Sequence, residues 1–328
     1  DVCSSDLDHL PLYRQRLIYQ RAGIELSRST LSDWIGRCGV ELEPLANALK
    51  EVVLQQQVLH ADETPVTIMR MGDDEKKPKK GYVWAYATTQ YNPIQAVIYD
   101  FQDSRSGQHA EEFLKGWQGY LVCDDYSGYK ARFKSGDVIE VGCMAHARRK
   151  FHELHVTGKS QVAEQALVLI QKLYAIEAEL RKKTDGTAEQ RREYRQQHNQ
   201  PVMQQLYEWL NQHQLTVPSS SPTAKAINYT LKRWPALSRY LDDGNLPIDN
   251  NWVENQMRPW ALGRKNWLFA GSLRSGQRAA NIMTLIQSAK LNGLDPYAYL
   301  SDVLKRLPTH KVTQIEELLP HRWKSNSN

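Results

Sequence analysis

The sequence has 328 residues, of which 41% are hydrophobic and 24% charged, and its formal net charge is +5. No run reaches the roughly 18 to 20 apolar residues of a membrane span, and the sequence shows no signal-peptide pattern, which argues against a membrane or secreted protein. Four scattered cysteines without a Cys-x-x-Cys pair argue against a zinc ribbon and indicate a reducing, cytoplasmic setting. The basic balance permits nucleic-acid binding without requiring it.

The first elements predicted are helices. Two short helices are expected at 11–21 and 29–39, with a glycine-containing turn between them. Because Arg28, Ser29 and Thr30 stand at the start of the second helix, the pair is typical of a DNA-binding helix-turn-helix. An ordinary αα-hairpin is the alternative.

After a third helix at 43–57, the apolar period changes to that of β-strands. Strands are expected at 58–68, 82–88, 94–100, 120–123 and 138–141, with a helix at 107–117. The polar stretch 72–81 indicates an exposed hairpin tip. Three strands in a meander, then helix, strand, helix and strand, is the order of an RNase H-like mixed sheet.

From Ala145 onward the strand pattern gives way to helical periodicity. Helices are expected at 161–182, 187–212 and 222–241, with breaks at Pro201 and Pro235, and later at 279–291 and 296–307. About one hundred residues of helix therefore separate the fifth strand from the segment 249–259.

The segment 249–259 indicates the start of a new helix. Asp249 or Asn250 can cap it, and Pro259 is expected to kink or stop it. Glu254 lies in its first turns. No acid occurs from residue 255 to residue 293, whereas six basic residues do: Arg258, Arg264, Lys265, Arg274, Arg278 and Lys290. A lone carboxylate beside a basic tract suits a metal-dependent enzyme acting on a polyanion; an ordinary i,i+4 surface pair between Glu254 and Arg258 is the alternative.

Two aspartates can complete an acidic site with Glu254. Asp62 lies in the first predicted strand and Asp124 at the end of the fourth, and these strands are neighbours in an RNase H-like sheet. Phosphodiester cleavage and transfer can be run by two divalent ions about 3.5–4 Å apart. Since Mg²⁺ takes hard oxygen ligands and keeps several waters, a few carboxylates suffice to hold it.

Several motifs resemble the transposases of the insertion sequence 66 family. They are His60-Ala61-Asp62-Glu63-Thr64-Pro65, Asp124-Asp125-Tyr126-Ser127-Gly128-Tyr129, and the segments 9–15, 249–255, 263–272 and 289–300. The resemblance extends from about Asp8 to Leu307. It implies a DDE active site in which Asp62 and Asp124 are metal ligands and Glu254 is the third acid. It also implies two Mg²⁺ or Mn²⁺ ions, 3′-end cleavage, and strand transfer of the element's ends into target DNA.

The sequence departs from the family pattern in two places. Asp125 stands where the family usually has glycine, and counting back from Tyr126 and Tyr129 favours Asp124 over Asp125 as the ligand. Family members usually carry an N-terminal leader and a zinc-binding segment, and neither is recognised here. The opening residues 1–7 do not match the family and are not expected to be native.

Basic residues near the acids are candidate DNA contacts. Arg258, Arg264 and Lys265 follow Glu254 and are predicted to hold phosphates. Arg148 and Arg149 follow the fifth strand, where a solvated helix face is the alternative.

Other candidates receive supporting roles. Cys143 and His146 have the spacing of a metal half-site, but a structural role is favoured without a second pair. Glu63 should point to the sheet face opposite Asp62. Trp260 and Trp267 could stack on splayed bases, although core packing is favoured.

The complete interpretation is an α/β protein with an RNase H-like DDE core, a large all-helical insertion and an N-terminal helix-turn-helix-like segment. The expected parts are 1–57 (DNA-binding helices), 58–144 and 246–307 (catalytic core), 145–245 (insertion) and 308–328 (tail). The partners expected are terminal inverted repeats and target DNA, accessory proteins of the same element, and further copies of the chain on DNA. A bacterial cytoplasmic, nucleoid-associated location is expected. Alternatives are a truncated, non-catalytic remnant that competes for transposon ends, and a general RNase H-like nuclease.

Overall fold

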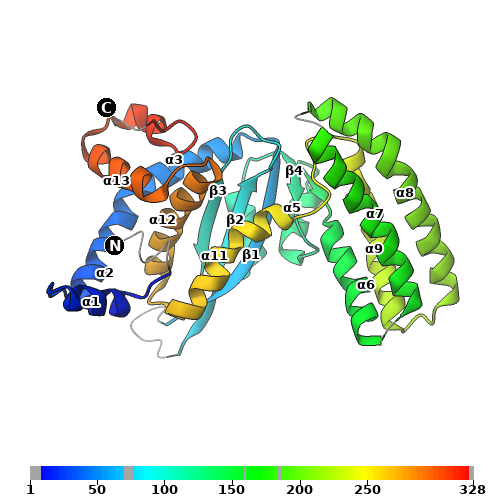
Figure 1. Cartoon of the computed structure of the whole chain (residues 1–328), viewed down its shortest axis with the longest axis horizontal. Coiled ribbons are helices and arrows are strands. Elements are labelled where there is room, and N and C mark those ends of the chain that lie inside the picture. The colour runs from blue at the N-terminus through cyan, green and yellow to red at the C-terminus, as the bar shows by residue number, and fades with distance from the viewer. Residues whose placement is uncertain (1–8, 70–76, 159, 184–185, 325–328) are drawn as a thin grey trace. The chain divides into compact units, whose positions relative to one another are not determined.

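The computed structural model describes residues 9–69, 77–158, 160–183 and 186–324. The protein is a mixed α/β structure that divides into two compact units (Figure 1). The sheet unit comprises Asp1–Gln118, Ser127–Asp137 and Trp252–Asn328, and the helical unit comprises Gly119–Tyr126 and Val138–Asn251. None of the described helices is both long and apolar enough to cross a membrane.

The sheet unit is built on an antiparallel meander. Strands β1 (Val58–Ile68), β2 (Lys79–Thr88) and β3 (Val97–Gln102) pair in that order, and the short β6 (Phe269–Ala270) pairs parallel with β1. This sheet is therefore mixed, and its first three strands were predicted from their apolar and β-branched runs. Residues 70–76, which include the first half of the predicted hairpin tip at 72–81, lie outside the described residues.

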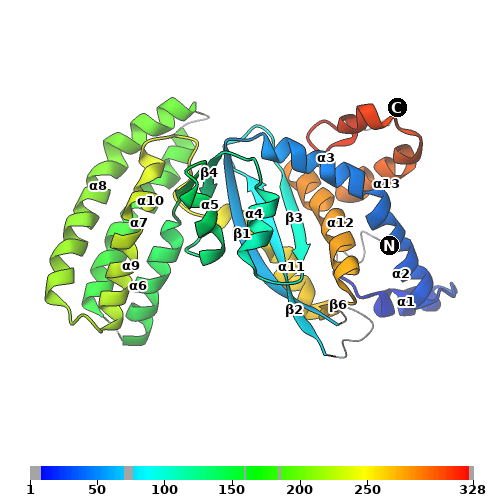
Figure 2. The same cartoon turned by 180° about the vertical axis from the view of Figure 1, so that it is seen from behind.

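Helices cover both faces of this sheet. Helix α11 (Asn251–Trp267) crosses one face in Figure 1, and α4 (Gly107–Phe113) lies on the opposite face, which Figure 2 shows. On the α4 face, Tyr86 stacks on Phe113 with ring centroids 3.7 Å apart. Trp84 meets Tyr129 of η2 (Ser127–Tyr129) edge-on at 5.9 Å. The aromatic residues of β2 therefore fill the core on this side, and the other face carries Asp62, as shown below.

The outer edge of β3 is covered by α12 (Leu273–Leu291). The Thr284 hydroxyl accepts a hydrogen bond from the Tyr99 N–H at 2.9 Å. The Ser288 hydroxyl accepts one from the Val97 N–H at 3.1 Å and donates to the Val97 carbonyl at 3.2 Å. Backbone groups that a further strand would pair with are thus satisfied by side chains of a helix.

The remaining helices of the sheet unit come from both ends of the chain. They are α1 (Leu12–Arg21), α2 (Arg28–Glu41), α3 (Glu43–Leu54) and α13 (Pro296–Arg306), with the 3₁₀ turns η4 (Leu307–Thr309) and η5 (Val312–Leu318). Helix α2 begins one residue before the predicted Ser29, because Ser27 accepts from the Thr30 N–H and caps it. The segment η5 contacts α3, and the Tyr299 hydroxyl donates to the Leu318 carbonyl, so packing continues past residue 307.

The helical unit joins two parallel strands to a group of helices. Strands β4 (Gly119–Val122) and β5 (Val138–Val141) pair in parallel. The helices are α6 (Met144–Gly158), α7 (Gln161–Lys183), α8 (Ala188–Thr216), α9 (Pro222–Lys232) and α10 (Trp234–Ser238), followed by η3 (Arg239–Leu241). The connection between the two strands, which contains η2 and α5 (Lys130–Lys134), belongs to the sheet unit.

The predicted break at Pro201 and the predicted stop at Pro259 are wrong, whereas the predicted break at Pro235 is confirmed. Helix α8 runs through Pro201, and α11 runs through Pro259 to Trp267. Both helices bury a stripe that spans the proline, in α11 Val253, Met257 and Trp260. Packing of that stripe outweighs the hydrogen bond that proline removes. At Pro235 the expected break is present, between α9 and α10.

A buried ion pair ties the helical unit together. Arg195 is fully buried, and its Nε and Nη2 donate to the two carboxylate oxygens of Glu177 at 2.8 and 2.9 Å. Its Nη1 donates to the carbonyls of Tyr240 and Leu246, in the segment that leads to Glu254. One guanidinium therefore links α7, α8 and the approach to α11.

Candidate functional site

Strand register determines the face on which Asp62 lies. Asp62 is opposite Ala85, and Ala85 is opposite Tyr99. Directly opposed residues of antiparallel strands place their side chains on the same face. The Tyr99 hydroxyl donates to the Gln256 carbonyl of α11 at 2.5 Å. Asp62 therefore lies on the face that α11 covers.

Glu63 lies on the other face, as predicted. Its carboxylate accepts a hydrogen bond from the Tyr129 hydroxyl at 2.8 Å and one from Arg105 Nε at 2.9 Å. The side chain of Glu63 is almost completely buried, at 2% exposure. The Glu63 carboxylate is therefore buried against Arg105 and Tyr129, on the face of the sheet opposite Asp62.

The first turns of α11 are fixed against the sheet on both sides of Glu254. Trp252 Nε1 donates to the Thr88 carbonyl at the end of β2, at 2.9 Å. Four residues later, the carbonyl of Gln256 accepts from Tyr99 of β3. Glu254 itself is half-buried and lies in the first turn, where the positive end of the helix dipole favours a carboxylate.

The turn that leads into α11 is built within the helical unit. Asp249 accepts from the Asn251 N–H at 3.0 Å and from the Tyr174 hydroxyl at 2.8 Å. Burial raises the pKa of the Asp249 carboxyl, although these two hydrogen bonds act in the opposite direction. Of the two predicted caps, Asp249 thus binds the first N–H of the helix.

Cys143 supports the same turn. Its sulfur accepts from the N–H of the fully buried Asn250 at 3.2 Å. Two residues earlier, the carbonyl of Ile248 accepts from the Met144 N–H at 3.1 Å. These contacts agree with a structural role for Cys143. His146 lies in the first turn of α6, with its Nε2 3.5 Å from Arg149 Nη1.

Asp124 and Asp125 have different surroundings at the end of β4. Asp125 pairs with Arg233 Nη1 at 2.5 Å, and the same guanidinium pairs with Glu140 at 2.9 Å. Asp124 is half-buried, and its Oδ1 accepts from the Tyr126 N–H at 2.9 Å. The Asp125 carboxylate is thus committed to a structural network, whereas the Asp124 carboxylate forms a local turn.

The sheet unit brings two of the three predicted acids to one side. Register turns Asp62 toward α11, and Glu254 is carried by that helix. Asp124 belongs to the helical unit. Carboxylate oxygens are the hard ligands that Mg²⁺ and Mn²⁺ prefer, so this donor set fits divalent ions.

Among the predicted DNA contacts, Arg264 has a defined partner in the sheet. Its Nη1 donates to the Thr64 hydroxyl at 3.1 Å and to the Pro65 carbonyl at 2.7 Å. Arg258 and Lys265 are exposed on the same helix. The other predicted contacts that are exposed are Arg148 and Arg149 on α6 and Arg28 and Ser29 on α2, and Thr30 is half-buried.

Three residues that position the acids have no signal in the sequence. Arg233 meets Asp125 across 108 residues, and Trp252 and Tyr99 bind α11 to the sheet through an indole and a phenol. Local periodicity marks such aromatic residues only as core. Their polar atoms acquire a role once strands and helix are assembled.

Comparison with known proteins places the chain in a family. The model of the transposase IS66 family matches residues 5–278, and that of the IS66 C-terminal element matches residues 284–321. Two uncharacterized proteins of Sinorhizobium fredii (strain NBRC 101917 / NGR234), y4qI and y4jD, are each 39% identical to the chain, over 98% and 97% of it.

The relatives are longer than this chain. It spans 61% of the length of y4qI and 64% of that of y4jD. The two family models nevertheless cover almost all of it, from the N-terminal helices to η5. This chain belongs to the IS66 family of transposases.

Proposed function

We propose that the chain is the catalytic part of a DDE transposase, which cleaves the 3′ ends of an insertion sequence and transfers them into target DNA. Asp62, Asp124 and Glu254 would hold two divalent ions, Mg²⁺ or Mn²⁺. The observation that carries the proposal is the common side of the sheet on which register and α11 put Asp62 and Glu254. Membership of a transposase family supports DNA as the substrate.

Each residue has a task in this proposal. When bound, the ions activate the attacking oxygen and stabilise the leaving oxygen. The carboxylates of Asp62 and Asp124 would be ligands, with Glu254 as the third acid. Trp252 and Tyr99 would keep Glu254 in register with β1. Arg258 and Lys265, together with Arg148 and Arg149, would hold phosphates.

The larger organisation is also a proposal. An RNase H-like core would be formed by 58–144 and 246–307, interrupted by the helical insertion 145–245. Residues 1–57, with Arg28, Ser29 and Thr30, would bind DNA as a helix-turn-helix, and 308–328 would form a tail. We further propose a bacterial cytoplasmic, nucleoid-associated location, with copies of the chain and accessory proteins assembling on terminal inverted repeats.

Substitution of Glu254 tests the proposal. Glu254→Gln keeps the shape of the side chain and removes its charge, so Mg²⁺-dependent cleavage of a duplex carrying the element's end should fall at least about a thousandfold. Binding of the same duplex should change less than about threefold, because phosphate contacts dominate affinity. Glu63→Gln is the matched control, since Glu63 lies on the opposite face. Full cleavage by the Glu254→Gln variant would overturn the assignment.

The same assay separates the alternatives. The second candidate is a non-catalytic remnant that competes for transposon ends. A remnant would bind transposon ends in a salt-dependent way without metal-dependent cleavage. A general nuclease would cut strands and join none.

A further inference from the structure

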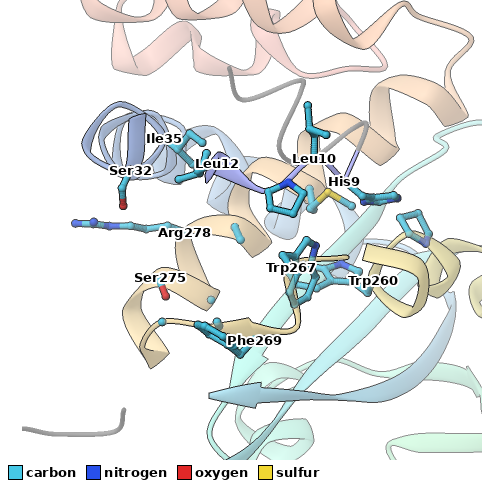
Figure 3. Close-up of a pocket in the computed structure, with 18 residues that line it drawn as sticks. His9, Leu10, Leu12, Ser32, Ile35, Trp260, Trp267, Phe269, Ser275 and Arg278 are labelled. Atoms are coloured by element: carbon cyan, nitrogen blue, oxygen red, sulfur yellow. The ribbon is translucent and has the colours of Figure 1, made fainter. Parts of the chain in front are cut away.

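The sheet unit contains a cavity of about 260 Å³ between the chain segment before α1 and helices α2, α11 and α12 (Figure 3). Trp260, Trp267 and Phe269 supply aromatic walls, and the two indole rings lie edge to face with centroids 6.2 Å apart. Pockets for drug-sized ligands have volumes of about 300–1,000 Å³. The cavity therefore fits one ring system better than a longer molecule.

Two buried N–H groups of lining residues have no acceptor. Trp260 is 3% exposed, and its Nε1 has no hydrogen-bond partner among the described residues. The same holds for Nε of Arg278. A buried donor without an acceptor is unfavourable, so a ring with acceptor atoms on its edge would be bound better than a purely apolar group.

The positive charge around the cavity favours binding of an anion. None of its 18 lining residues is acidic, and Arg278 extends from α12 past Gly36 toward Ser32 of α2 (Figure 3). Arg274 is exposed on the first turn of α12. A matching ligand has three features: an aromatic ring for the aromatic walls, acceptor atoms on the ring edge for the two N–H donors, and a negative group for the arginines.

Exposed apolar side chains stand beside the cavity. Phe269 is 43% exposed and Leu268 is 64% exposed. Leu268 has φ of +68°, a left-handed conformation that a branched side chain rarely adopts. Backbone strain of this kind persists where the surrounding structure fixes it, and it clusters at functional sites.

We propose that this cavity, the Trp260 pocket, binds one unpaired nucleobase of the DNA. The base stacks on Trp267 and Phe269, its ring acceptors face the Trp260 indole N–H, and its phosphate lies toward Arg278. The proposal rests on the proposed function only in that DNA is the ligand. It differs in location and chemistry from the acidic site and involves no metal.

A metal-free binding assay tests the pocket. A fluorescein-labelled oligothymidylate and an abasic oligomer of the same length carry the same phosphates, but only the first carries bases. Fluorescence anisotropy in EDTA should give about tenfold tighter binding of the oligothymidylate, in the range of one base–aromatic stack. Equal affinity for both oligomers, or binding of neither, would overturn the proposal.

Two substitutions locate that preference in the cavity. Ala279→Leu fills the space and Trp267→Ala removes a wall, and each should bring the affinity ratio of the two oligomers close to one while abasic binding persists. Tyr297→Ala is the control, because Tyr297 is 65% exposed on α13, outside the segment proposed to bind DNA as a helix-turn-helix, and does not line the cavity. A ratio unchanged in either folded pocket variant, checked by thermal unfolding, would exclude this site. Since no cleavage is measured, a failure here and a failure of the Glu254→Gln test are distinguishable.

Discussion

The two units hold their predicted catalytic acids by different means. In the sheet unit, Asp62 is placed by strand register, and Glu254 by a helix that neutral groups, Trp252 and Tyr99, bind to the sheet. In the helical unit, the residue after Asp124 belongs to an ion network with Arg233. Neutral hydrogen bonds keep their strength as pH and salt change, whereas ionic networks respond to both. The helical unit should therefore be the more sensitive to charge substitutions.

The largest effect is expected at the buried ion pair of the helical unit. Arg195→Leu leaves the Glu177 carboxylate, which is 1% exposed, without its cation, and should lower the free energy of unfolding by about 3–5 kcal/mol. Urea denaturation followed by circular dichroism measures the change. The double variant Arg195→Leu/Glu177→Leu should recover much of the loss, because no charge then remains buried. A double variant as unstable as the single one would show that the carbonyl contacts of Arg195, and not the ion pair, hold the unit together.

An intermediate effect is expected at the two neighbouring aspartates, with opposite signatures. Asp125→Gly, which introduces the residue usual in the family, removes a partner of Arg233 and should cost about 1–2 kcal/mol of stability, since Asp125 is 34% exposed. Metal-dependent cleavage should be kept. Asp124→Asn should leave stability within about 0.5 kcal/mol and abolish cleavage. If the two variants exchanged these phenotypes, Asp125 would be the ligand and the contrast between the units would fail.

The smallest effect concerns Asp249 and pH. Burial raises the pKa of this carboxyl above its unfolded value of about 3.9, so the folded chain binds the proton more tightly than the unfolded chain. The stability contributed by the protonated form is present below the unfolded pKa and is lost as pH rises through the folded pKa. Asp249→Asn removes this dependence.

The free energy of unfolding of the Asp249→Asn variant, measured by urea denaturation, should therefore rise relative to that of the parent chain as pH increases from about 4 to 6.5, by about 1 kcal/mol at most. Asp243→Asn, a substitution elsewhere in the approach to α11, is the control. A difference that shrinks with rising pH would mean that the hydrogen bonds from Tyr174 and Asn251 outweigh burial.

Helices and strands with strong local patterns could be predicted from the sequence, whereas effects of tertiary packing on them could not. The strand 138–141 and the helix 161–182 follow directly from β-branched and helical periodicity. The helices through Pro201 and Pro259 could not be predicted, because buried stripes on both sides of each proline determine them. The presence of proline in the sequence predicts a helix break, whereas the tertiary packing that stabilises the helix through proline cannot be predicted from the local pattern.

The acids themselves could be selected from the sequence through motifs, but their surroundings could not. The motif favours Asp124 over the adjacent Asp125, but the pairing of Asp125 with Arg233, 108 residues away, could not be predicted from the sequence. Glu63 was separable from Asp62 because alternation along a strand is a local rule. What depends on one chain segment was predictable, and what depends on two distant segments required the fold.

The hydroxyl groups of Thr284 and Ser288 have a consequence for association. They accept hydrogen bonds from the N–H groups of Val97 and Tyr99 in β3, which an incoming strand would otherwise use for pairing. An exposed edge strand is a template for edge-to-edge pairing and aggregation. With α12 in place, this edge is closed to strand addition, so two copies of the chain cannot associate by pairing strands here.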